Sequence, residues 1–363
     1  MCVVHQIEPV KSESFADNLM QMLNHGALMV MISVGHRTGL FDQMSKLPPS
    51  TSMQIAESAG LNERYVREWL GAMTTGRIVE HEPESKTYSL PAEHAAFLTR
   101  DAGADNIGVF AQYIPVLGTV EDKIIECFKN GGGVPYSEFK RFHELMAEDS
   151  GQSVVSSLIE LILPAVPGIV DGLEKGIDVL DLGCGRGKAL NLMARVFPKS
   201  RFVGYDLSED AIEYARNEAR DLNLKNVRFE VVDLTYFNQF ASEKSYDFIT
   251  TFDAVHDQAR PDNLLAGIYK ALKEDGTYLM QDISASAEHH KNIDHPVGTL
   301  LYTVSTMHCM TVSLAQGGMG LGTMWGLETA VKMLNEAGFS NIEIKNFDHD
   351  FQNDWYIIKK QVS

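Results

Sequence analysis

The chain has 363 residues, which is enough for two domains and at most three, each with its own hydrophobic core. Hydrophobic residues make up 44% and charged residues 22%, a composition that excludes a mainly disordered chain. With 31 basic against 49 acidic residues the net charge is −18, so the surface repels the phosphates of nucleic acids and of anionic membranes. We therefore expect neither a nucleic acid nor a membrane as a partner.

The four cysteines, Cys2, Cys127, Cys184 and Cys309, are scattered and form no C-x-x-C pair. This pattern argues against a disulfide framework or a zinc ribbon and suits a reducing compartment. The N-terminus has too few apolar residues for a signal peptide, and no stretch reaches 18 uninterrupted apolar residues. We expect a cytoplasmic protein.

The N-terminal part predicts a winged helix-turn-helix. Residues 15–47 have helical periodicity, and Thr51 or Ser52 can begin a short helix that Gly60 ends. A second helix and two short strands are expected at 62–75, 77–81 and 86–90. These elements make residues 1–99 a winged-helix domain.

The charge of this module argues against DNA binding. Between residues 51 and 99 there are four basic and seven acidic residues, a net charge of −3. A protein that reads DNA needs a positive surface. We therefore expect the winged helix to pack or to dimerise, with a homodimer as the result.

From residue 177 onward short apolar runs alternate with helical stretches, whereas residues 100–170 are mostly helical. Alternating strands and helices predict a parallel sheet covered on both faces. The last two strands, 341–346 and 354–359, are only seven residues apart and should therefore pair antiparallel. The expected fold class is α/β, a Rossmann-like sheet over residues 171–363, with residues 100–170 as a helical linker and lid.

The first strand of this sheet ends in Asp181 and then the loop Gly183-Cys184-Gly185-Arg186-Gly187, directly before a helix. Glycines allow a backbone to approach a ligand because no Cβ stands in the way. A dinucleotide fingerprint would need glycine where Lys188 stands, and the P-loop spacing is absent.

An acid followed by G-x-G-x-G resembles motif I of class I S-adenosylmethionine-dependent methyltransferases. The resemblance implies that the Asp181 region holds the methionyl amino group, that Asp206 bonds the ribose and that Asp233 bonds the adenine. S-adenosyl-L-methionine is then the expected cofactor, and its cationic sulfonium and ammonium suit an acidic cradle. The full set of expected cofactor-binding residues is Asp181, Gly183, Cys184, Gly185, Gly187, Asp206, Leu207, Asp233, Leu234, Phe252 and Asp253. The alternative for Asp206 and Asp233 is that each only caps the helix that follows it.

The preceding winged helix extends the resemblance to the dimerising small-molecule O-methyltransferases. In the plant enzymes a His-Asp pair follows the fourth strand, and its histidine takes the proton of the substrate hydroxyl. His256 and Asp257 match that pair, although Gln258 stands where those enzymes have tryptophan. Histidine suits this work because its ordinary pKa lies near 6.5. The alternative is that His256 only bonds the backbone or floors the cofactor site.

The acceptor pocket is expected to be lined by Phe142, His143, His308, Cys309 and Trp325. The segment 135–150 should cover the cofactor. A Cys–His nucleophile at His308-Cys309 is the alternative, but neighbouring side chains point apart in regular structure. No metal is expected: His289, His290 and His295 lack metal-ligand spacing, and only Asp253 and Asp282 leave a catechol-type metal site open.

The sequence thus predicts an S-adenosylmethionine-dependent methyltransferase that alkylates O, S or N of a small molecule. The alternative, from another class, is a regulator that binds the cofactor without turnover. A transcription factor is disfavoured by the charge.

Overall fold

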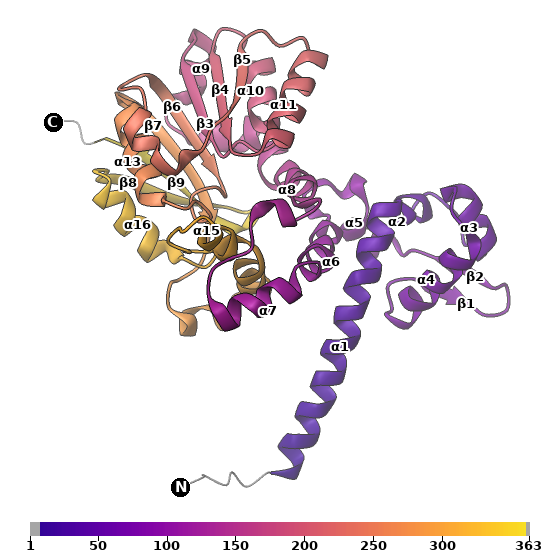
Figure 1. Ribbon diagram of the computed structural model, residues 1–363. Coiled ribbons are helices and arrows are strands. Elements are labelled where there is room, and N and C mark those ends of the chain that lie inside the picture. The colour runs from indigo at the N-terminus through magenta and orange to yellow at the C-terminus, as the bar shows by residue number, and fades with distance from the viewer. Residues whose placement is uncertain (1–7, 361–363) are drawn as a thin grey trace, which may run out of the picture. The chain divides into compact units, whose positions relative to one another are not determined.

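The computed structural model describes residues 8–360 (Figure 1). Cys2 therefore lies outside the described residues. The chain divides into two compact units, with the boundary between Pro115 and Val116. The expected three-part division at residues 99 and 170 stays a prediction; by contacts, residues 116–170 belong with the sheet.

The N-terminal unit begins with α1 (Pro9–Thr38) and α2 (Leu40–Met44), where one helix over 15–47 was expected. Gly39 separates them because its φ of 71° ends the first helix in the left-handed region. Most of α1 is solvent-exposed, including a series of large apolar side chains: Val10, Phe15, Leu19, Met20, Met22 and Leu23.

The winged helix follows as predicted. Its elements are α3 (Ser52–Ala59), α4 (Glu63–Thr75), β1 (Glu80–Glu82) and β2 (Thr87–Ser89). Thr51 caps α3 through a capping box with Gln54, and Gly60 ends that helix in the left-handed conformation. Phe41, Leu70 and Met73 are fully buried between the helices. The unit continues through α5 (Ala92–Leu98), η1 (Arg100–Asp105) and η2 (Ile107–Gln112).

The segment before the sheet is helical, as expected. Its elements are α6 (Tyr113–Gly118), α7 (Glu121–Asn130), η3 (Tyr136–Glu138), α8 (Phe142–Ser150), η4 (Gly151–Val155), η5 (Leu158–Ile162), η6 (Leu163–Ala165) and α9 (Ile169–Lys175).

No single described helix is long and apolar enough to cross a membrane. Only a bent pair, 142–165 with 169–175 at 105°, has the length and composition for it. Leu158, Ile162 and Leu173 of this pair are fully buried in the core of the second unit. The apolar character of the pair is thus explained by packing on the sheet.

The second unit contains a seven-stranded sheet in the order β5-β4-β3-β6-β7-β9-β8. The strands are β3 (Asp178–Leu182), β4 (Arg201–Asp206), β5 (Val227–Val231), β6 (Tyr246–Phe252), β7 (Leu272–Ile283), β8 (Asn341–Phe347) and β9 (Asp350–Lys359). The first five are parallel to one another, and β9 is antiparallel to both β7 and β8. This confirms the predicted α/β fold class and the antiparallel final pair.

Alternate residues along the strands face two separate hydrophobic cores. Val179 and Phe248 pack with α9, α10 (Lys188–Val196) and α11 (Glu209–Asp221). Leu180 and Ile249 face the opposite core, with α12 (Phe237–Phe240), α13 (Pro261–Ala271) and α16 (Gly326–Glu336). Helices thus cover both faces (Figure 1). The remaining elements are η7 (Leu234–Tyr236), η8 (His289–Asn292), α14 (Gly298–Val304), η9 (Ser305–Cys309) and α15 (Met310–Ala315).

The order of the strands fixes where a ligand can bind. The chain moves outward from β3 in one direction to β4 and β5, and then returns to the other side of β3 with β6 and β7. At such a reversal the loops that follow neighbouring strands diverge and leave a crevice at the carboxyl edge of the sheet.

Candidate functional site

The glycine-rich loop lies at this crevice, directly after β3. The amides of Gly183 and Cys184 both donate to the carbonyl oxygen of Tyr205, at 2.8 and 3.0 Å, which holds the loop against the end of β4. The φ angles of Gly183, Gly185 and Gly187 are 74°, 51° and 67°. Residues other than glycine rarely adopt this left-handed region.

The three glycines serve different purposes. A Cβ on Gly183 would lie 2.5 Å from that of Ala254, and one on Gly187 would lie 2.4 Å from the ring of Phe229. These two glycines therefore allow close packing within the protein. A Cβ on Gly185 would meet no atom within 4 Å. Gly185 alone thus leaves open space for a ligand against the backbone.

The carboxylate of Asp206 shapes the same loop. Its two oxygens accept hydrogen bonds from the amides of Gly185 and Ser208, both at 2.8 Å. Asp233 is exposed and accepts from the amide of Thr235 at 2.9 Å, so it caps η7. The capping that the sequence left open is therefore present at Asp233, whereas Ser208 and not Asp206 caps the following helix, α11. The ribose contact of Asp206 and the adenine contact of Asp233 stay predictions.

The flanking residues differ in exposure. Leu207 is exposed, whereas Leu234 is buried in a core. Phe252 packs on Trp355, with ring centroids 6.0 Å apart, and the thiol of Cys184 packs in the core beside it. Burial raises the pKa of that thiol well above its ordinary value. Their contact with a cofactor also stays a prediction.

Carboxylic acids accumulate at this edge of the sheet. Asp181 is buried and accepts from Thr250 Oγ1 at 2.7 Å, and burial raises its pKa to about 7. Burial likewise raises the pKa of Asp257 to about 6. The pKa of Asp253 is raised well above its ordinary value by burial and by the nearby Asp282. A site with these properties favours a cation, because a positive ligand would stabilise the ionised carboxylates.

His256 follows β6 and is buried, but its partner is not the predicted one. Its Nδ1 lies 2.8 Å from Asp282 Oδ1, whereas Asp257 accepts from Gln258 Nε2 at 3.2 Å. The partner of the imidazole Nδ1 is thus Asp282, which β7 carries to the ring, and not the adjacent Asp257, whose catalytic role stays a prediction. Burial lowers the pKa of His256, but Asp282 and a hydrogen bond with Cys309 outweigh it and raise the pKa well above 6.5.

Asp282 is held in place by its other partners. Its Oδ1 also accepts from Trp325 Nε1 and from the amide of Ile283, both at 2.9 Å. Trp325 was expected to line the acceptor pocket, but its indole is buried and supports Asp282. Sequence reasoning named Asp282 only as a possible metal ligand. The signal in the sequence that could have identified Asp282 is its position as an acid at the end of the next strand along the chain from His256.

Asp253, His256 and Asp282 place one ligand atom each within 4.8 Å of one another, close enough to surround a metal ion. Two of their atoms already bond each other, His256 Nδ1 and Asp282 Oδ1. Asp253 Oδ2 accepts from Gln281 Nε2 at 2.9 Å. The absence of a metal stays a prediction.

The segment that was expected to cover the cofactor packs beside the acids. The amide of Val134 donates to Thr311 Oγ1 at 2.8 Å, which fixes its start. Tyr136 Oη lies 3.2 Å from His143 Nδ1, and the two rings stack. Burial raises the pKa of Tyr136 well above 10, and the charges of Asp257 and Asp206 add to this effect. Tyr136 and His143 thus lie near Asp206, the carboxylate that bonds the glycine loop.

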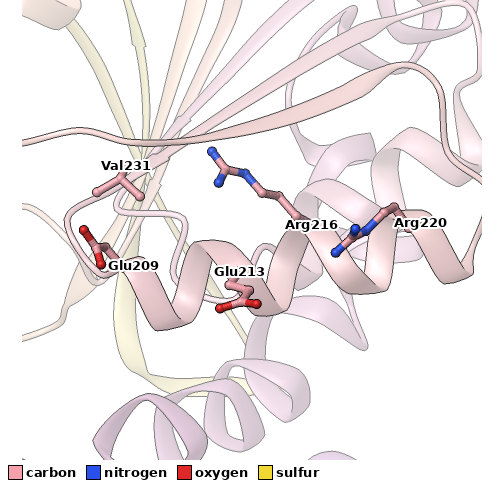
Figure 2. A pocket seen from close by; sticks show the side chains of 5 residues that line it. All are labelled: Glu209, Glu213, Arg216, Arg220 and Val231. Carbon is pink, nitrogen blue, oxygen red and sulfur yellow. The ribbon is translucent and has the colours of Figure 1, made fainter.

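A hollow lies along α11 and is lined by Glu209, Glu213, Arg216, Arg220 and Val231 (Figure 2). Two atoms of the Arg216 guanidinium donate to the carbonyl oxygen of Phe229, at 2.9 and 2.7 Å. Two acids are followed by two bases along the helix in this hollow, and none of the predicted site residues lines it.

Comparison with protein families matches both units. Residues 26–100 match an Rv2258c-like winged HTH domain, and residues 173–345 match a methyltransferase domain. Similar curated proteins include the (S)-coclaurine N-methyltransferase of Papaver somniferum, 27% identical over 37% of this chain and 41% of that protein. The fatty-acid O-methyltransferase of Mycolicibacterium smegmatis is 28% identical over 30% of this chain and 38% of that protein. The chain thus spans about two fifths of the length of these relatives.

Solved structures share the fold over nearly the whole chain. The mitomycin 7-O-methyltransferase MmcR has a TM-score of 0.70 at 15% identity, covering 97% of this chain and all of that one. Human N-acetylserotonin methyltransferase in complex with SAM has a TM-score of 0.65 at 15% identity, and the match covers 99% of this chain and 100% of that one.

The chain is therefore a methyltransferase-fold protein with an N-terminal winged-helix domain, as the sequence predicts. Its residues 173–345 match the methyltransferase domain family, and S-adenosyl-L-methionine stays the expected cofactor. The open space at Gly185 and the acidic edge fit this cationic ligand.

We expect Gly185→Val to abolish cofactor binding, measured by calorimetry, because the new side chain fills the space that Gly185 leaves open. Gly168→Val is the matched control: Gly168 also has a positive φ, 77°, and its Cβ also meets nothing within 4 Å. Gly168→Val should introduce similar backbone strain and leave cofactor binding unchanged. Equal losses in both variants would mean that strain, not the site, causes the effect.

We expect cofactor binding to release protons between pH 6 and 7. Asp181 and Asp257, with pKa values of about 7 and about 6, are partly protonated there, and a bound cation lowers both pKa values. Affinity should therefore fall as the pH falls below this range. Calorimetry in two buffers of different ionisation enthalpy measures the proton count. S-adenosylhomocysteine, which lacks the sulfonium charge, should release fewer protons; an equal count would contradict the prediction.

Proposed function

We propose that the protein transfers the methyl group of S-adenosylmethionine to an oxygen, sulfur or nitrogen atom of a small molecule, with His256 as general base. The observation that carries this proposal is the buried His256–Asp282 pair at the carboxyl edge of a methyltransferase sheet, beside the acids that suit the cofactor. Several similar proteins are named as O- or N-methyltransferases of small molecules, which supports this substrate class.

The residues divide the work as follows. When bound, the cofactor would supply a methyl group on a positively charged sulfur, which would leave as a neutral thioether when the acceptor takes the methyl group. Gly185 and Asp206 hold the loop that receives the cofactor, and Asp181 favours its positive charge. His256 takes the proton of the acceptor while Asp282 fixes the ring through Nδ1. Cys309 is the other hydrogen-bonding neighbour of the imidazole.

The raised pKa of His256 determines the pH dependence. A base must be unprotonated before it can accept a proton, so turnover should rise with pH through the raised pKa of His256. Proximity to the cofactor also contributes, because a nucleophile held about 3–3.5 Å from the methyl carbon reacts without further reorganisation.

A regulator that binds the cofactor without turnover is the competing function. Release of S-adenosylhomocysteine, measured with a panel of phenols, thiols and amines, separates the two. An active enzyme releases it with at least one acceptor. Tight cofactor binding with no release across the panel would favour the regulator.

We expect His256→Ala to lower kcat by about two to four orders of magnitude for a hydroxyl or thiol acceptor, with little change in cofactor affinity. The loss should shrink as the pH rises, because the acceptor then ionises without help. A neutral amine acceptor should keep most of its rate. Loss of cofactor affinity instead of kcat would show a structural role for His256.

Asp282→Asn and Asp257→Asn form a matched pair for this test. Asp282→Asn removes the carboxylate that raises the pKa of His256, so the rising limb of the pH–rate profile should move to lower pH while the maximum rate falls. Asp257 makes no hydrogen bond to His256 among those described, so Asp257→Asn should shift the limb less. The reverse order would reinstate the predicted His256–Asp257 pair.

We expect the protein to form a homodimer through the exposed apolar side chains of α1, and not to bind duplex DNA. Sedimentation at several protein concentrations measures the assembly. Leu19→Glu together with Leu23→Glu should give monomers, whereas Lys11→Glu, on the same helix, should not. A monomeric wild-type protein that retards DNA would contradict both expectations.

A further inference from the structure

His308 is the only described side chain with two buried polar atoms that lack a hydrogen-bond partner. Its residue is only 1% exposed, yet neither Nδ1 nor Nε2 meets a donor or an acceptor. Leaving a buried polar group unpaired is costly, so such a group calls for an explanation. His308 lies in η9, a π-helical turn, and turns of this kind are frequent at functional sites.

Aromatic rings surround the imidazole. Phe142 stacks on it with centroids 3.4 Å apart, and Phe139 and Tyr136 meet it edge to face at 4.6 and 5.2 Å. A neutral imidazole has one N–H and one lone pair. The face of an aromatic ring can accept the N–H weakly, but it offers nothing to the lone pair. One nitrogen of His308 therefore lacks a hydrogen-bond donor.

The surroundings also keep His308 neutral. Burial lowers its pKa well below 6.5, and the nearby His256 and His143 lower it further. The lone pair therefore stays available at neutral pH. His308 also directly precedes Cys309, which hydrogen-bonds the proposed base His256.

We propose that His308 binds the methyl acceptor by accepting a hydrogen bond from an O–H or N–H group other than the one that is methylated. This inference rests on the proposed function and names the substrate class: small molecules with two neighbouring polar groups, one for His256 and one for His308. His308 is then a positioning residue that selects such molecules over those with a single polar group.

The first test uses stability and needs no acceptor. Phenylalanine has nearly the shape of the imidazole and no unpaired polar atom, so His308→Phe should raise the Tm by about 2–4 °C. His143→Phe is the matched control, because its Nδ1 has a partner in Tyr136 and its removal should not stabilise the protein. A lower Tm for His308→Phe would mean that the ring is hydrogen-bonded in the native protein and would overturn the proposal.

The second test uses catechol and phenol as probes of the protein loaded with S-adenosylhomocysteine. Catechol, with two adjacent hydroxyls, should bind about tenfold more tightly than phenol by calorimetry. His308→Phe should remove this preference, and His308→Gln, whose side-chain oxygen can accept the same bond, should retain it. Equal affinities for the two probes, or no binding of either to the wild type, would overturn the proposal.

The two proposals can fail separately. Failure to bind S-adenosylhomocysteine would contradict the proposed function, whereas normal binding without a catechol preference would contradict only the role of His308. For an acceptor that is turned over, His308→Phe should raise KM more than it lowers kcat. A loss confined to kcat would make His308 the base and overturn its positioning role.

Discussion

A single carboxylate oxygen, Oδ1 of Asp282, accepts hydrogen bonds from His256, from the indole of Trp325 and from the amide of Ile283. These three donors come from the loop after β6, from the start of α16 and from the end of β7. The carboxylate therefore fixes the imidazole and determines its pKa, because it stabilises the protonated ring against the effect of burial. Without this contact the orientation of His256 would depend only on packing and on its hydrogen bond with Cys309.

The same edge of the sheet collects features that cost stability. Asp181 is a buried acid and Asp253 and Asp257 are half-buried acids, and their raised pKa values reflect unfavourable ionisation. His308 has no hydrogen-bond partner. The cores on the two faces of the sheet, by contrast, consist mainly of apolar side chains. Local conflicts of this kind are expected where function, and not folding, selects the residues. Their concentration at one edge separates the site from the hollow along α11.

The glycine loop shows how far a motif can be interpreted. Its position after a buried strand followed from the sequence and is confirmed, whereas its hydrogen bond to Asp206 is seen only in the structure. The sequence could not distinguish glycines that pack against the protein from the one that leaves room for a ligand. That difference depends on Ala254 and Phe229, which reach Gly183 and Gly187 from other strands and loops. Spacing along the chain carries no information about such neighbours.

The sequence by itself determined the winged helix, the α/β sheet with its antiparallel final pair and the order of the site-bearing loops. These depend on local periodicity, on capping residues and on the lengths of connections, all of which are encoded over a few residues. Only the tertiary structure decided that Asp282, 26 residues away, and not the adjacent Asp257, holds His256. Adjacent side chains point apart, whereas neighbouring parallel strands bring their carboxyl ends together. The contact between His256 and Asp282 therefore depends on the order of the strands in the sheet. Spacing along the sequence does not show this order.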